Sequence, residues 1–481
     1  MLDASSLRDA GLSDDDAATV VKLLSLLGDR QHHNKLRAAY YEGEARVRQL
    51  GIAIPPQMQS VKTVVGWPST IVDAIEERTD IDGFAVEGTA DDLGLGEIWH
   101  DNSMPVSSGM AHVDALIHGV GFLTVTPGGD GEPAQLLTVE PATTMTGVWD
   151  ARSRRLTSAL SAVHDDHGQI SSVTLFTLDG IHDLVRQEGG GWSRDSQDNW
   201  LADERRLPVY RLVNRPRSSK PWGQSEITSA VRSYVDTAVR TLLGMEIARE
   251  FYSSPQRWIM GAKEDAFVGA DGEPRTAWET YLGRILALER DEDGQIPAVG
   301  QFNAASPEPY VAQVKLMAEL VAAESALPLT YLGFHTHNPP GGDGIRAQET
   351  RHVKRAERRA RTWGPEYALA MSDAVFLRDG TRPPRITTLW RDPATPTRAA
   401  TADEVTKYVA TGVLRPDSEV TRERVGFDEA TRRRLADEDQ SMRARETVMA
   451  LRQAGDAARQ DPRVAQLTTR RPEDGVAAAD G

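Results

Sequence analysis

The sequence lacks cysteine, long apolar runs and an excess of positive charge, and each absence excludes a class of protein. Without cysteine, the 481-residue chain can form neither disulfides nor thiolate-ligated metal sites. No apolar run approaches the roughly 18 residues of a membrane span, so no membrane association is expected. The first residues, MLDASSLRDAGLSDDD, are acidic and lack the apolar segment of a signal peptide.

The net charge of -16 argues against general nucleic-acid binding. Neutralising phosphates requires a basic surface, whereas an acidic surface repels DNA and would leave it free to slide. The sequence also lacks the phosphate-binding loop of nucleotide hydrolases, a dinucleotide fingerprint after a strand, and the nucleophile elbow of serine hydrolases. These absences leave no common enzyme signature.

Histidine groups are the remaining candidates for metal chemistry. His164-Asp165-Asp166-His167 resembles a metal-hydrolase pair, but it precedes Gly168 and equally fits a polar turn between two strands. His112, Asp114 and His118 fall on a predicted helix without ligand spacing. His335 and His337 have no nearby third ligand except Asp343. A catalytic metal needs about three protein ligands, so none of these groups indicates an enzyme.

The hydrophobic periodicity divides the chain into helical and β regions. Spacings of three and four residues predict helices over 13–28, 31–42, 68–79, 90–101 and 105–118, with a strand at 81–86 between them. From 121 to 213 the period changes to two, which predicts antiparallel strands at 135–139, 156–164, 170–178 and 209–213. Residues 189–199 look like an exposed hairpin tip or loop.

Two long helices bracket a small α/β segment in the second half of the chain. The first is predicted over 225–252 and the second over about 307–326, with helix and strand patterns at 274–282, 285–289 and 296–299 between them. After residue 391, three further helices are predicted at 401–411, 418–436 and 440–459. The polar residues 461–481 are expected to be disordered.

The stretch from Leu327 to Leu377 contains the most distinctive pattern. A loop rich in glycine and proline, His335–Gly344, precedes a long helix that is expected to start near Ile345. One face of this helix is basic and consists of Arg351, Lys354, Arg355, Arg358 and Arg361. This face is either simply solvated or meets an anionic partner, and the pattern alone allows both interpretations.

Several short motifs, taken in order, resemble the portal (head-to-tail connector) proteins of tailed double-stranded DNA bacteriophages. They are YYEGE at 40–44, Asn214 followed by the segment Pro221 to Ile227, Leu327-Pro328-Leu329 through Asn338, and Gly344-Ile345-Arg346-Ala347. The resemblance covers about residues 20 to 430. The chain departs from many relatives at Gly342-Asp343-Gly344, where they carry serine before the glycine.

The resemblance implies an α+β portal-like fold with a helix-rich wing and an inserted antiparallel β region. The wing would comprise 1–224 and the helix and strand of 345–390. Stem helices at 225–252 and 307–327 would flank a small α/β clip at 253–306. A tunnel loop at 328–344, a helical crown at 391–460 and the tail at 461–481 would complete the chain.

The same resemblance implies a structural role without catalysis or cofactor. A homo-oligomeric ring, expected to be a dodecamer, would sit at one capsid vertex of the virion after assembly in the host cytoplasm. Double-stranded DNA would pass through its channel during packaging and ejection. The expected partners are the terminase large subunit, head-completion or adaptor proteins, and the major capsid or scaffold protein.

Within this role, the tunnel loop is expected to face DNA. Its residues are His335, Thr336, His337, Asn338, Pro339, Pro340, Gly341, Gly342, Asp343 and Gly344. Two alternatives remain open: a metal-dependent hydrolase that uses the His164–His167 cluster, and another minor structural protein of the virion.

Overall fold

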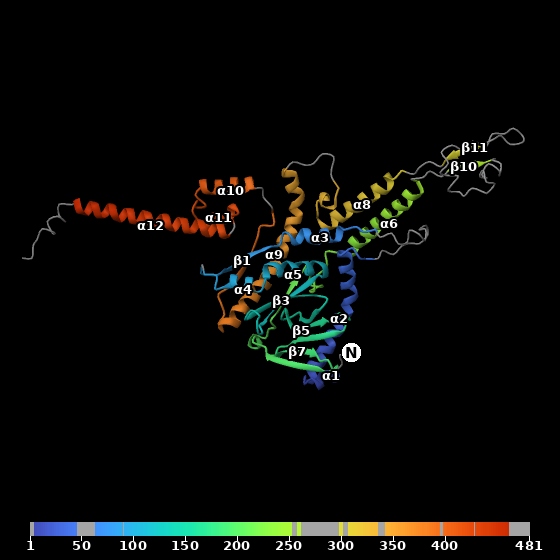
Figure 1. Cartoon of the computed structure of the whole chain (residues 1–481), viewed down its shortest axis with the longest axis horizontal. Helices are drawn as coiled ribbons and strands as arrows, with labels where there is room; N and C mark the ends of the chain where they lie inside the picture. Colours follow the sequence, from blue (N-terminus) through green and yellow to red (C-terminus); the bar gives the residue numbers. More distant parts are fainter. Residues whose placement is uncertain are drawn as a thin grey trace, which may run out of the picture. The chain divides into compact units, whose positions relative to one another are not determined.

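The structure is a computed structural model in which mixed helices and sheets form two compact units (Figure 1). It describes residues 4–45, 63–89, 91–252, 257–260, 298–301, 306–334, 342–394, 398–427 and 429–460. The first unit is Met1–Pro393 and the second is Ala394–Gly481. Among the helices that the structure describes, none is both long and apolar enough to cross a membrane.

The N-terminal helices begin with α1 (Ala4–Asp9) and α2 (Asp14–Tyr41). Ser13 caps α2 by accepting a hydrogen bond from the Asp16 amide at 3.1 Å. The sequence predicted two helices here, and that prediction was wrong, because α2 continues through Gly28. Leu27 and Asn34 are buried on either side of it, and the Asn34 amide donates to the Ala142 carbonyl. Packing of both halves outweighs the about 1 kcal/mol that glycine costs inside a helix.

Three further helices and a two-stranded sheet follow. They are α3 (Trp67–Glu76), α4 (Leu95–Asp101), α5 (Met104–His118), and the antiparallel pair of β1 (Ile81–Val86) with β12 (Ile386–Trp390). Helix α4 starts later than the predicted residue 90. Asp92 side-chain oxygens accept hydrogen bonds from the Gly94 and Gly96 amides, so this aspartate holds a turn before the helix.

The β region forms two antiparallel sheets. One has the order β3-β2-β9, built from β2 (Val120–Pro127), β3 (Gln135–Pro141) and β9 (Val209–Val213). The other has the order β4-β5-β6-β7-β8, built from β4 (Met145–Asp150), β5 (Arg155–His164), β6 (Ile170–Phe176), β7 (Gly180–Arg186) and β8 (Trp192–Asp198). The prediction of a loop over 189–199 was wrong for its second part, because β8 pairs with β7. As an edge strand, β8 is exposed and carries polar residues on both faces, so no alternation marks it.

The long helix α9 (Gly342–Asp379) closes the core of the first unit. Its buried residues Trp363 and Tyr367 pack with α4, α5, β2 and β9 in the largest apolar cluster. The Trp363 indole donates to the Val213 carbonyl at 3.1 Å, which fixes α9 against β9. The helix begins three residues before the predicted Ile345.

Helices α6 (Ser229–Tyr252) and α8 (Glu308–Ser325) run side by side (Figure 1). Small and branched side chains, including Val231, Ala238, Ala318 and Val321, form their shared core. This core continues onto α3 and the 3-10 turn η4 (Leu329–Leu332). Between the two helices, β10 (Arg257–Met260) pairs with β11 (Ala298–Gln301). The patterns predicted at 274–282 and 285–289 lie outside the described residues.

The second unit consists of α10 (Arg398–Ala410), α11 (Glu419–Val425) and α12 (Glu429–Gln460). The sequence placed a helix boundary between 436 and 440, and this was wrong. Gly426, at a φ of 88°, ends α11 instead, and α12 runs through 436–440 because that segment contains no proline or glycine. The residues 461–481, which were expected to be disordered, lie outside the described part of the chain.

Candidate functional site at the start of α6

The start of α6 is held by a buried carboxylate, that of Glu226. Its Oε2 lies 2.6 Å from Nη2 of Arg355, and its Oε1 pairs with Arg359. Arg215 approaches Oε2 at 3.6 Å, and the Asn214 amide donates to Oε1 at 2.9 Å. Only 2% of Glu226 is exposed. One acid therefore joins the segment after β9, the start of α6 and the N-terminal half of α9.

Close backbone contact makes this junction possible. Gly223 has a φ of 73°, and a Cβ there would lie 2.3 Å from the Gly119 carbonyl and 2.4 Å from the Asn214 carbonyl. The Gln224 amide donates to the Asn214 carbonyl at 2.8 Å, and the Glu226 amide donates to Leu116 at 2.9 Å. Only glycine fits at 223, and its absence of a side chain lets Glu226 reach the arginines.

The charges at this junction stabilise one another, although a single carboxylate serves three guanidinium groups. Burial alone would raise the pKa of Glu226, but the guanidinium groups of Arg359 and Arg355 hold that pKa below its ordinary value. Burial lowers the pKa of Arg359, and Glu226 opposes this change. The carboxylate is therefore ionised at neutral pH, and both arginines depend on it for their only close negative partner among the described residues.

The structure divides the predicted basic face of α9. Arg355 contacts Glu226 and also donates to the carbonyls of Glu324 and Ser325 at the end of α8, while Arg351 donates to Ala323 at 3.4 Å. Cations at a helix C-terminus are favourable because the last carbonyls are otherwise unpaired. Arg351, Lys354, Arg358 and Arg361 are exposed, whereas the Arg355 side chain is largely covered, and Lys354, Arg358 and Arg361 are the exposed members that do not reach the end of α8.

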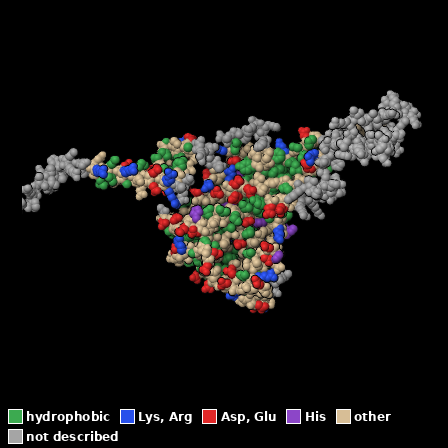
Figure 2. Space-filling view, in the orientation of Figure 1, with side chains coloured by type: hydrophobic (Ala, Val, Ile, Leu, Met, Phe, Trp, Pro, Cys, Tyr) green, Lys and Arg blue, Asp and Glu red, His purple; other side chains and the backbone are tan. Residues whose placement is uncertain are grey.

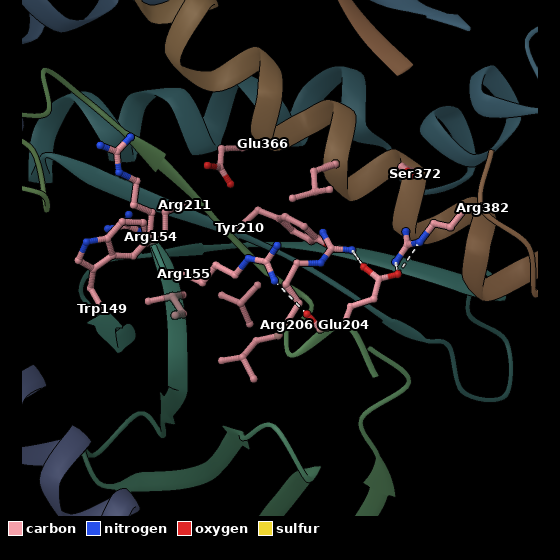
Figure 3. A pocket seen from close by; sticks show the side chains of 14 residues that line it. Trp149, Arg154, Arg155, Glu204, Arg206, Tyr210, Arg211, Glu366, Ser372 and Arg382 are labelled. Carbon is pink, nitrogen blue, oxygen red and sulfur yellow. Dashed lines mark hydrogen bonds and ion pairs between the residues drawn. The ribbon is translucent and has the colours of Figure 1, made fainter. Parts of the chain in front are cut away.

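A second buried network lies between α9 and β9, around Asp373. Its Oδ1 accepts from Arg206 Nη2 at 2.6 Å and from Arg382, and its Oδ2 accepts from the Tyr210 hydroxyl. Glu204 pairs with both arginines. Figure 3 shows four members of this network, Glu204, Arg206, Tyr210 and Arg382, among the side chains that line a pocket.

Two of these buried charges, Arg359 and Asp373, were missed by the sequence analysis. Arg359 stands four residues after Arg355 and therefore on the same helix face, a signal that could have identified it. Asp373 lies among apolar residues of α9, where an isolated acid indicates a buried partner.

The predicted tunnel loop is only partly described. Residues 335–341 lie outside the described residues. The structure places Gly342, Asp343 and Gly344 in the first turn of α9.

Of the histidines considered as metal ligands, those that the structure describes pack in the core or flank a turn. His112 stacks on Trp363 at 4.5 Å between ring centroids, its Nε2 lies 3.1 Å from the Tyr367 hydroxyl, and burial lowers its pKa to about 3. His164 and His167 flank an exposed turn, in which Asp165 accepts from the amides of His167 and Gln169. In the described part of the chain, no three His, Asp or Glu residues gather as metal ligands, and nothing there supports the hydrolase alternative.

Comparison with known proteins identifies a family. A family profile described as "Phage portal protein, SPP1 Gp6-like" matches residues 29–432. The portal protein of Mycobacterium phage D29 is 34% identical over 467 residues, which are 94% of this chain and 93% of that protein. The portal protein of Mycobacterium phage L5 is 33% identical over 434 residues, which are 86% of each chain.

Two solved structures are also similar, both necks of GTA particles. The neck of the native particle with C12 symmetry has a TM-score of 0.41 and 16% identity, and covers 82% of this chain and 99% of its own. The neck of the empty particle with C6 symmetry has a TM-score of 0.42 and 15% identity, with coverage of 78% and 94%. The family assignment rests on the sequence matches. Because the profile spans most of the sequence and both portal relatives match nearly end to end, the chain belongs to the phage portal protein family.

Proposed function

We propose that this protein is the structural portal of a tailed bacteriophage. It forms a ring at one capsid vertex, provides the channel through which DNA is packaged and ejected, and docks terminase and later the head-completion proteins. The observation that carries this function is the family match over residues 29–432, together with relatives that are themselves portal proteins. The chain is a virion component with no catalytic role, and ATP hydrolysis belongs to terminase.

The proposed ring has a wing at 1–224 and 345–390, stem helices at 225–252 and 307–327, a clip at 253–306, and a crown at 391–460. The side-by-side packing of α6 and α8 supports the assignment of the stem. Helix α8 also carries the apolar side chains Val311, Leu316 and Leu320, which are 52%, 50% and 36% exposed. Leu316 and Leu320 are four residues apart and share one face of α8, and their exposure among the described residues fits burial against a neighbouring copy.

The tunnel loop at 328–344 is proposed to face DNA and to touch it sterically, since it contains no lysine or arginine. Lys354, Arg358 and Arg361 are proposed to meet acidic groups of a neighbouring copy or DNA phosphates. The other basic residues of the face already have partners in this chain. Figure 2 shows many acidic side chains over the sheet-containing body, consistent with a net charge of -16 that would keep DNA mobile.

The mass and shape of the purified protein test the proposal. One chain has a mass of 52.7 kDa, and a closed dodecamer would therefore have a mass of about 630 kDa. Light scattering should report this mass, and negative-stain imaging should show rings with an axial hole. Some portal rings assemble only in the presence of scaffold protein, so the protein should also be co-expressed with the major capsid and scaffold proteins. A monomer under both conditions would refute the proposed ring.

A further inference from the structure

A cavity of about 400 Å³ lies in the first unit between the β4–β5 hairpin, β9 and α9 (Figure 3). We call it the Arg206 pocket. Its charged lining residues are the arginines Arg154, Arg155, Arg206, Arg211 and Arg382 and the acids Glu204 and Glu366. Apolar side chains such as Leu156 and Leu369 complete the wall. The volume is within the range of small-molecule sites, about 300–1,000 Å³.

One donor of this pocket has no partner. Arg206 is 7% exposed, and its Nη2 binds Asp373 and Glu204, but its Nη1 is buried without any hydrogen-bond acceptor. A buried guanidinium donor that is left unpaired costs free energy, and a bound water, ion or ligand is one way to satisfy it. The orphaned atom belongs to a residue that lines the cavity.

Further donors are available at the rim. Arg155 is exposed and uses its Nη1 to donate to the Glu204 carbonyl at 2.9 Å, which leaves its remaining donors for other acceptors. Arg154 is exposed as well, on the same turn. Arg211 is different, because its guanidinium lies over the Trp149 ring at 3.4 Å and donates to the Pro221 carbonyl.

The charge balance of the pocket is positive in a protein that is strongly acidic overall. Five arginines face two glutamates, and Asp373 behind them lowers the balance by one, which leaves two net positive charges. Burial also raises the pKa of Glu366, which weakens the negative contribution of that residue near the cavity. A small volume with convergent guanidinium groups is the usual environment for phosphate and carboxylate recognition.

We propose that the Arg206 pocket binds a free small ligand through an oxyanion, either a phosphate or a carboxylate group, which accepts from Arg155 and Arg154 at the rim and, after a small shift of the side chains that cover it, from Arg206 Nη1. The apolar wall would accommodate a short organic part of such a ligand. This site does not depend on the portal role. Because the bound ligand contacts both the β4–β5 turn and Arg206 before β9, it stabilises the folded first unit.

Calorimetric titration of the full-length protein at fixed ionic strength tests the proposal, with inorganic phosphate and acetate as separate probes and chloride as the balancing anion. The wild-type chain should bind at least one probe saturably, and that probe should raise the melting temperature. Whichever probe binds identifies the oxyanion class.

The variants Arg155→Ala and Arg154→Ala should each weaken binding by about tenfold, because each removes a charged donor. Both side chains are exposed, so the fold should persist, which circular dichroism checks. Arg152→Ala is the matched control, since Arg152 is exposed on the same turn but does not line the pocket. The proposal is overturned if neither probe binds the wild-type chain, or if the two pocket variants bind as tightly as the Arg152→Ala control.

Discussion

Replacing Glu226 by glutamine should destabilise the first unit more than any surface substitution. Glutamine preserves the size of the side chain and one carbonyl oxygen, so the change isolates the negative charge. In the native chain this charge faces Arg355 at 2.6 Å and the nearly buried Arg359, which is 4% exposed. After the substitution both guanidinium groups would remain buried without a counter-charge.

The size of the effect follows from the burial of the pair. Breaking a buried ion pair from one side costs about 3–5 kcal/mol, mainly because the remaining charge is uncompensated. The unfolding entropy is about 2.1 cal/mol/K per residue, which gives about 0.8 kcal/mol/K for a unit of this size. The melting temperature of Glu226→Gln should therefore fall by about 4–6 °C.

Thermal unfolding of the purified chain, followed by near-ultraviolet circular dichroism, measures this shift. Glu319→Gln is the matched control, because Glu319 is an exposed acid on α8 and its loss changes the net charge equally. The control should alter stability by less than about 0.5 kcal/mol. If Glu226→Gln melted at the temperature of the control, the assignment of Glu226 as the charge that compensates Arg355 and Arg359 would be refuted.

Three other predictions concern the fold and its titration. Burial, with a smaller effect from Glu140, raises the pKa of Asp114 to about 6, so the folded state holds this proton between pH 4 and 6, and stability falls as pH rises through that window. Above pH 6 this titration costs the wild-type chain up to about 3 kcal/mol of unfolding free energy, and Asp114→Asn should remove that cost. Urea unfolding should therefore show the variant to be more stable than wild type at pH 7 but not at pH 4. A variant that is more stable by the same amount at both pH values would contradict the assignment. Gly223→Ala should be far more destabilising than Gly168→Ala, because both glycines have a φ of 73° but only Gly223 has carbonyls within 2.4 Å of the added Cβ. Gly168→Ala should cost about 1–2 kcal/mol in the same unfolding assay, and similar losses in both variants would show that the close backbone contact does not matter. A chelator such as EDTA should leave the melting temperature of the wild-type chain unchanged. A lower melting temperature in EDTA would instead support the hypothesis of a metal site at His164–His167.

Local structure was largely accessible from the sequence. The helix expected at 105–118 and the strands expected at 135–139, 156–164 and 209–213 lie within two residues of their observed bounds, because hydrophobic periodicity depends only on neighbours a few residues away. Errors occurred where packing outweighs local preference. Gly28 did not interrupt α2, because the buried residues on both sides of it hold the helix together.

The buried charge networks were not accessible in the same way. Glu226 is 129 residues from Arg355 and 133 from Arg359, and Asp373 is 167 residues from Arg206. Hydrophobic periodicity predicts which face of a helix a side chain lies on, but it does not identify the residue that this side chain contacts across the core. The basic pattern of α9 was therefore visible, whereas its division into buried and exposed members required the fold.

The position of Arg355 has a mechanical consequence. The same guanidinium group contacts the acid that precedes α6 and the carbonyls that end α8, so both helices share one anchor on α9. A pull or twist on α6 or α8 would therefore reach α9 through Arg355, with Arg359 beside it on Glu226 and Arg351 beside it on Ala323. The two helices should consequently move together as one rigid pair rather than hinge separately, and loss of Arg355 would weaken the attachment of both to α9 at once.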